Sequence, residues 1–144
     1  MGLLERLFGA APEAGRSVEP VHLGRGRGFT FEIVGEASYQ EALDAICGGK
    51  CEEGYNLPVV AQLCFQEDNP HDRNAIVVVI DRKVVGYVPR DLAPEMRKAI
   101  LKLNPEERPV TCDAKVVGGW LRDEDDEGHY GVKLSLSHPL RRAP

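Results

Sequence analysis

The sequence has no secretory signal, no hydrophobic run of membrane-spanning length and no CxxC pair. The first two absences predict a cytoplasmic protein with no membrane partner. Thiols stay reduced in that compartment, so we expect no disulfide among the four cysteines, which are Cys47, Cys51, Cys64 and Cys112. A length of 144 residues favours a single domain with a substantial core.

The sequence also has no excess of basic residues over acidic ones. The chain carries 18 Lys and Arg against 23 Asp and Glu, and residues 29–100 hold seven basic and twelve acidic side chains. A protein that coats nucleic acid by neutralising many phosphates needs the opposite balance. The composition still allows a pocket in which two or three cations grip the end of one strand.

No complete catalytic motif is present. There is no phosphate-binding P-loop and no nucleophile elbow, so we expect neither an enzyme nor a cofactor. A metal-dependent hydrolase is the weaker alternative, because Glu67, Asp68, His71 and Asp72 form an acidic cluster with a histidine. Structural zinc at Cys47 and Cys51 lacks a second pair of ligands, so no metal is predicted.

The most informative stretch runs from residue 59 to residue 90. Its middle, residues 68–74, contains only polar or turn-forming residues, and Asn69-Pro70 favours a turn. Residues 75–80 are almost all β-branched, which predicts a buried central strand. A short turn at residues 81–83 then leads into a second arm over residues 84–88, so we expect a hairpin.

The remaining pattern indicates a mainly β domain with two short helices. Strands are predicted over residues 29–34, 57–65, 110–116 and 130–136, giving about six in all. One helix is predicted to begin at an N-cap on Ser38, with Glu41 completing a capping box, and a second to begin at Asp91. Antiparallel hairpins of this number favour an OB-like small β-barrel, because closure removes exposed strand edges.

We place this domain at residues 29–137. Residues 1–28 are predicted to be a flexible segment, with a short amphipathic turn at Leu3, Leu4, Leu7 and Phe8 and a linker rich in glycine and arginine after it. Residues 138–144 are predicted to be a flexible tail. We expect a monomer.

The segments NPHDRNAIVVV, from Asn69, and VGYVPRDLA, from Val85, resemble the HIRAN domain. This family occurs at the N-terminus of some fork-remodelling translocases and as small free-standing bacterial proteins. The resemblance covers roughly residues 29–102. It implies an OB-like barrel that captures the 3′ end of single-stranded DNA in DNA repair or replication.

Through this resemblance, Asp72 is the expected acceptor of the terminal 3′ hydroxyl and Arg90 the expected phosphate contact. The other implied contacts are Asn69 in the turn and three rings that can stack on bases, Tyr39, His71 and Tyr87. Arg73 and Lys50 are weaker candidates for phosphate contacts. Ala37 and Ser38 depart from the family, whose translocase members carry an Arg-Tyr pair there, and this predicts weaker binding.

Two readings compete with DNA binding. Each site residue can instead serve the fold, with the asparagine and aspartate side chains ordering the turn and the tyrosines packing at the rim of the core. The domain could also be a protein-interaction module whose cleft takes a peptide or another domain, which suits its acidic surface.

Overall fold

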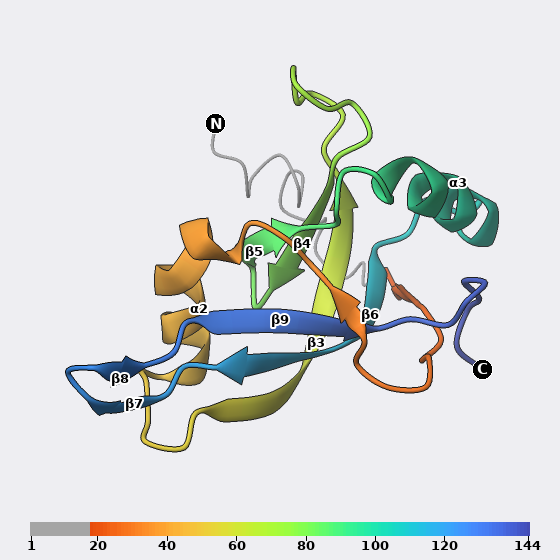
Figure 1. The fold of residues 1–144 in the computed structure, drawn as a ribbon. Coiled ribbons are helices and arrows are strands. Elements are labelled where there is room, and N and C mark those ends of the chain that lie inside the picture. Colours follow the sequence, from red (N-terminus) through yellow and green to blue (C-terminus); the bar gives the residue numbers. More distant parts are fainter. Residues whose placement is uncertain (1–17) are drawn as a thin grey trace.

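The computed structural model describes residues 18–144, which fold into a mainly β structure with two α-helices (Figure 1). No helix in this range is long and apolar enough to cross a membrane. The elements are β1 (Val21–His22), β2 (Phe31–Glu32), the 3-10 helix η1 (Glu36–Tyr39), α2 (Gln40–Cys47), β3 (Tyr55–Phe65), β4 (Ile76–Ile80), β5 (Lys83–Tyr87), α3 (Ala93–Leu103), β6 (Val110–Gly118), β7 (Leu121–Asp123), β8 (Asp126–Glu127) and β9 (Tyr130–Ser135).

Six strands form one strongly curled antiparallel sheet in the order β2-β9-β6-β3-β4-β5, and β1 joins β6 in parallel. The two ends of this order meet just beyond β2, where Val34 and Tyr87 exchange two backbone hydrogen bonds of 2.8 Å each. The curled sheet is therefore consistent with the predicted OB-like barrel. Pro58 lies where β3 pairs with β6 but not with β4, so its missing N–H removes no ladder bond there.

The core fills the inside of the curl. All five residues of β4 are buried, as expected for the predicted central strand, and buried residues alternate with partly exposed ones along β6. Leu43 of α2 and Ile100 of α3 complete the core with 0% and 1% exposure. Burial raises the pKa of the Cys112 thiol to about 12, so this cysteine is a packing residue.

The predicted N-caps of the two helices are each wrong by one residue. The chain first makes the 3-10 turn η1, so α2 begins at Gln40 and Ser38 is no N-cap. Helix α3 begins at Ala93 after Leu92, and neither helix has a side-chain cap. In α2, Gln40 instead joins the helix to β9, because its amide donates to the carbonyl of Tyr130 and accepts from the N–H of the same residue.

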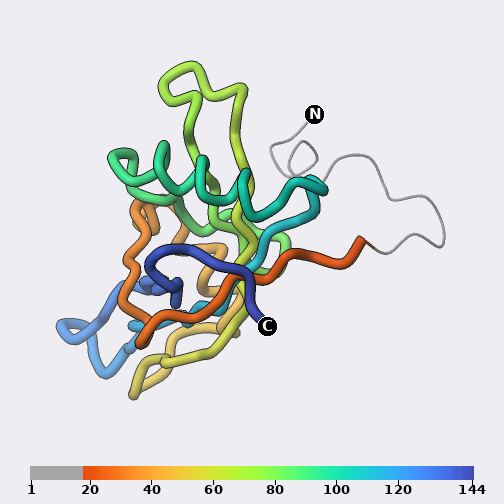
Figure 2. The backbone as a smooth tube through the Cα atoms, turned by 90° about the vertical axis from the view of Figure 1, so that its right-hand side faces the viewer, coloured from red at the N-terminus to blue at the C-terminus, as the bar shows by residue number. Residues whose placement is uncertain are grey.

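The predicted linker is wrong for residues 21–23, and the predicted tail is wrong for residues 141–143. Val21 and Leu23 are each 1% exposed, and Leu23 bridges to Arg142. Figure 2 shows the C-terminal segment beside the segment after residue 20. Glycine is required at Gly26, because a Cβ atom there would lie 2.4 Å from the carbonyl oxygen of Leu136. The predicted amphipathic turn at residues 3–8 lies outside the described residues.

Candidate nucleic-acid interface

The loop between β3 and β4 is ordered by its own side chains. The Oδ1 atom of Asn69 accepts a 2.9 Å hydrogen bond from the N–H of His71, and Oδ1 of Asp72 accepts one of 2.9 Å from the N–H of Asn74. Such asparagine and aspartate turns let a polar segment hold one conformation without a core. The turn role that the sequence suggested for Asn69 and Asp72 is therefore present in the structure.

Arg90 connects this loop to the end of the β4–β5 hairpin. Its Nη2 atom donates a 2.7 Å hydrogen bond to the carbonyl oxygen of His71, across 19 residues of sequence. Within residues 18–144, Arg90 forms no ion pair, so its charge is not neutralised by a nearby carboxylate there. The guanidinium has five N–H donors, and one bond to a carbonyl leaves others for an anion.

Tyr39 and Tyr87 lie together, although 48 positions separate them. Both pack against a small buried cluster formed by Cys64, Val77, Val79 and Val84. Burial and a side-chain hydrogen bond with Tyr87 raise the pKa of Tyr39 to about 12. The sequence did not predict this contact, because it depends on η1 being held against β5 by the Val34–Tyr87 pairing.

The predicted site residues thus fall into two groups. The first is the loop of Asn69, His71 and Asp72 with Arg90, and the second is the pair Tyr39 and Tyr87. Among the described residues, no hydrogen bond or ring contact joins the two groups. They are nevertheless placed at the same end of β5, because Tyr87 ends this strand and Arg90 follows three residues later.

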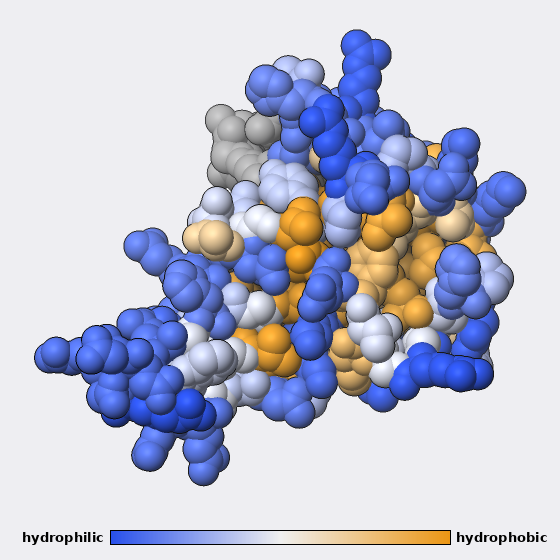
Figure 3. Space-filling model, viewed as in Figure 1, coloured by the Kyte–Doolittle hydropathy of each residue, from blue (hydrophilic) through white to orange (hydrophobic). Residues whose placement is uncertain are grey.

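The loop forms a polar projection of this face. Figure 3 shows hydrophilic residues over the loop at the top of the molecule, above a more apolar surface. His71 is exposed and Asp72 is half-buried. A loop of this kind can present a ring, a carboxylate and a cation to a ligand without exposing the core.

The two weaker cation candidates differ. Lys50 forms an ion pair with Glu127, and this contact lowers the pKa of the glutamate. Its charge is therefore already neutralised. Arg73 is exposed at the tip of the loop and makes no ion pair with any residue of the described range.

The acidic cluster considered for a metal is divided in the structure. Glu67 forms an ion pair with Arg97 of α3, while Asp72 engages the loop backbone. Among residues 18–144, no three side chains of His, Cys, Asp or Glu are close enough to hold a metal ion.

One aromatic group that the sequence did not indicate lies on the outside of the sheet. Phe29 was expected to begin the strand over residues 29–34, but it lies before β2 and is half-exposed between two cations. The guanidinium carbon of Arg25 is 5.7 Å and Nζ of Lys115 is 5.1 Å from the ring centroid. Alternation in the sequence could not reveal this, since β2 is only two residues long.

One of the comparisons with known proteins identifies a family. The family model described as the HIRAN domain matches residues 38–126, which is more than half of the chain. No curated protein and no solved structure matches the chain. The matched range includes all six predicted site residues. The chain therefore belongs to the HIRAN domain family, a family of nucleic-acid-binding modules.

Proposed function

We propose that this domain binds single-stranded DNA, preferentially at a free 3′ end, and acts without catalysis in DNA repair or replication. The binding surface consists of Tyr39, Asn69, His71, Asp72, Tyr87 and Arg90. Membership of the HIRAN family supports nucleic-acid binding in general. The end preference and the pathway are inferences from the loop and from the family resemblance.

The observation that carries the proposal is the hydrogen bond between Arg90 and the carbonyl of His71. It holds an unneutralised cation beside the loop that carries the Asp72 carboxylate. In this arrangement, the cation can bind the phosphate of the last linkage while the carboxylate accepts a hydrogen bond from the terminal hydroxyl. One oxygen of Asp72 is used by the N–H of Asn74, and the other remains for that hydroxyl.

Selectivity follows from the sign of the charge on Asp72. A phosphate in place of the terminal hydroxyl would bring negative charge against the carboxylate, which is repulsive. An internal nucleotide would present a phosphate at the same point. A single carboxylate thus distinguishes a free 3′ end from both alternatives.

The tyrosine pair supplies a surface for base stacking. Each base stacked on an aromatic ring contributes about 1 to 3 kcal/mol in single-strand binding proteins. Tyr39 and Tyr87 pack against the same buried cluster, so both rings are held in place before a ligand arrives. Ala37 and Ser38 add no ring and no cation beside them, so we expect a modest affinity with strong salt dependence.

The test is fluorescence anisotropy with a short labelled single-stranded DNA that ends in a 3′ hydroxyl, the same strand with a 3′ phosphate, and a duplex. We expect the hydroxyl form to bind about tenfold more tightly than the phosphate form. Asp72→Asn keeps an oxygen for the turn but removes the charge, so it should abolish this difference and leave the fold unchanged.

Asp125→Ala is the matched control, because it removes an exposed carboxylate from the β7–β8 turn at no predicted site. It should bind like the unmodified protein. Arg90→Gln should weaken all single-stranded forms alike, since it removes a phosphate contact rather than an end contact. Equal binding of the hydroxyl and phosphate strands by the unmodified protein would contradict end recognition.

A further inference from the structure

Strand β3 has a free backbone edge at its C-terminal end. Its pairing with β6 stops at Leu63↔Val110, whereas its pairing with β4 continues to Phe65↔Ile76. On the side that faced β6, residues 64 and 65 therefore have no strand partner within the described range. An unpaired edge of this kind is a template for a further strand.

The reason for the early end of the ladder is the turn before β6. The side chain of Asn104, which is 8% exposed, accepts a 2.9 Å bond from the N–H of Arg108 and donates a 2.8 Å bond to its carbonyl. These bonds satisfy the backbone of Arg108 away from β3. The chain thus turns toward α3 instead of continuing along the edge of Phe65.

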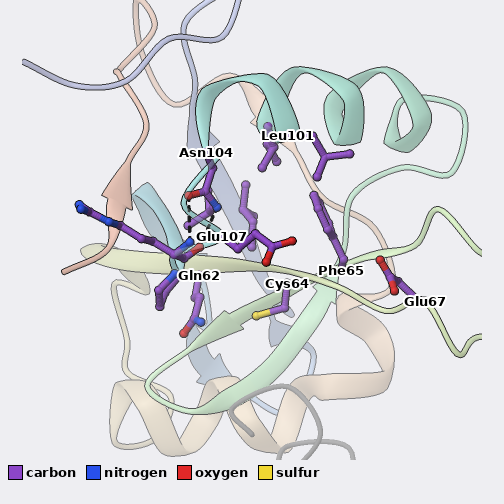
Figure 4. Close-up of a pocket in the computed structure, with 12 residues that line it drawn as sticks. Gln62, Cys64, Phe65, Glu67, Leu101, Asn104 and Glu107 are labelled. Carbon is purple, nitrogen blue, oxygen red and sulfur yellow. Dashed lines mark hydrogen bonds between the residues drawn. The ribbon is translucent and has the colours of Figure 1, made fainter. Parts of the chain in front are cut away.

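The space left between this edge and α3 is a groove of about 370 Å³. Figure 4 shows Phe65 and Leu101 pointing into it from the strand and the helix. Its apolar lining includes Leu63, Cys64, Phe65, Ile100, Leu101 and Val110. Leu101 is 49% exposed, so the groove is open to solvent on the helix side.

The end of the strand is fixed against α3 by Arg97. Its guanidinium carbon lies 4.4 Å from the ring centroid of Phe65, and the same group forms an ion pair with Glu67. Edge, aromatic ring and helix are therefore held in place before any ligand binds. A preformed groove lowers the entropy that binding must overcome.

The groove carries a negative charge without a counter-ion. Three charged residues line it, and two of them are paired, Glu67 with Arg97 and Arg108 with Glu106. Glu107 makes no ion pair with a described residue. It adopts a φ of 53°, unusual for a residue other than glycine, and Figure 4 shows it beside the space between α3 and β3.

We propose that this groove binds an extended peptide segment of a partner protein in which apolar and basic residues alternate. The peptide would add a strand to the free edge at Phe65, as in other cases of strand addition. Its apolar side chains would enter the groove against Leu101, and a basic side chain would meet Glu107. DNA fits this groove poorly, because its phosphates would face that unneutralised carboxylate.

The test is a titration of the ¹⁵N-labelled full chain with a short peptide of alternating lysine and valine, followed by amide chemical shifts. We expect saturable shifts at residues 63–67 and 101–108, and protection of the Phe65 N–H from hydrogen exchange. The same peptide with every residue N-methylated has no N–H to donate to a strand edge and should bind about tenfold more weakly. A peptide of alternating glutamate and valine should also bind about tenfold more weakly.

Two variants distinguish peptide binding in the groove from binding elsewhere on the surface. Leu101→Asp places a charge in the groove and should weaken the peptide about tenfold. Leu121→Asp is its matched control, since Leu121 is 48% exposed on β7, outside the groove, and it should leave binding unchanged. Both positions are exposed, so neither change removes a core residue.

Several results would overturn the proposal. These are the absence of shifts at residues 63–67, equal binding of the N-methylated peptide, and an equal effect of the two leucine variants. Shifts of the same amides on addition of single-stranded DNA alone would assign the groove to the nucleic acid. Shifts that grow with protein concentration alone would assign it to a second copy of the chain.

Discussion

Strand β4 and the loop that precedes it are adjacent in sequence but are held in place in different ways. β4 is buried along its whole length, and its neighbours β3 and β5 pair with it on both sides. The loop at residues 66–75 is mostly exposed. A bond from the N–H of Gln66 to the carbonyl of Ala75 closes its base, and the other hydrogen bonds within it join residues two or three positions apart, such as His71 to Asn69. Side chains from farther along the chain also bond to it, Arg90 to the carbonyl of His71 and Arg97 to Glu67.

This difference teaches that fold and ligand binding can be altered separately in this domain. A change in the barrel removes contacts among many distant residues, so it lowers the free energy of unfolding. A change in the loop removes local bonds in contact with water, where each is worth far less. If a loop substitution lowered the free energy of unfolding more than a barrel substitution did, this would show that the loop supports the barrel.

The largest expected effect belongs to the barrel. Ile76 is 0% exposed, and Ile76→Ala should lower the free energy of unfolding by about 3 kcal/mol, because it leaves a cavity. Urea unfolding followed by circular dichroism measures this. Val60→Ala is the control, since Val60 is 56% exposed, and it should change stability by less than about 0.5 kcal/mol. A similar loss for both would contradict the assignment of the core.

The next effect tests the closure of the curled sheet at Val34 and Tyr87. A Cβ atom on Gly86 would lie 2.6 Å from the carbonyl oxygen of Val34 and 2.8 Å from Cδ1 of Ile33. Gly86→Ala should therefore destabilise the protein by about 2 kcal/mol through overpacking. Gly28→Ala is the matched control, because its nearest contact would be 3.9 Å away. Thermal unfolding compares them, and equal melting temperatures would mean that the closure is loose.

The loop should be less sensitive. Asn69→Ala removes the bond from the N–H of His71 and the 3.1 Å bond to the side chain of Gln66, at a cost of about 1 kcal/mol. Its main result should be faster exchange of the His71 amide and weaker binding of single-stranded DNA. Hydrogen exchange by NMR measures the first. A loss of stability as large as that of Ile76→Ala would show that the loop belongs to the folding core.

Most of the fold could be predicted because its larger elements carry periodic signals. The hairpin of β4 and β5 and the alternation in β6 were identified from the sequence within two residues of their observed ends. Two-residue strands carry no periodicity, so β1 could not be predicted. For the same reason, the sequence did not predict the pairing of Leu23 with Arg142, which links the two ends of the described chain.

The candidate site could be predicted where local chemistry determines it. The turns at Asn69 and Asp72 depend on side-chain and backbone atoms two residues apart, and such short-range bonds follow from residue type. The contact of Tyr39 with Tyr87, and the bond from Arg90 to His71, depend on the path of the chain between them. No pattern within a short window of sequence encodes contacts of that range.

The smallest expected effect concerns a surface ion pair that joins residue 25 to β6. Nε of Arg25 lies 2.6 Å from Oδ2 of Asp113, and this bond, together with His22, lowers the pKa of the aspartate. A lowered pKa stabilises the folded state above the ordinary value of 3.8, and this contribution disappears as the pH falls below it.

Arg25→Gln should therefore reduce stability by about 0.5 kcal/mol at neutral pH and by less near pH 3, because exposed ion pairs contribute little. Urea unfolding at the two pH values measures the difference, and Arg27→Gln is a control that touches no described carboxylate. If Arg25→Gln instead cost as much as Gly86→Ala, the segment before β2 would be held by charge. The backbone bonds of β1 and Leu23 to β6 predict the opposite, since they do not involve the arginine side chain.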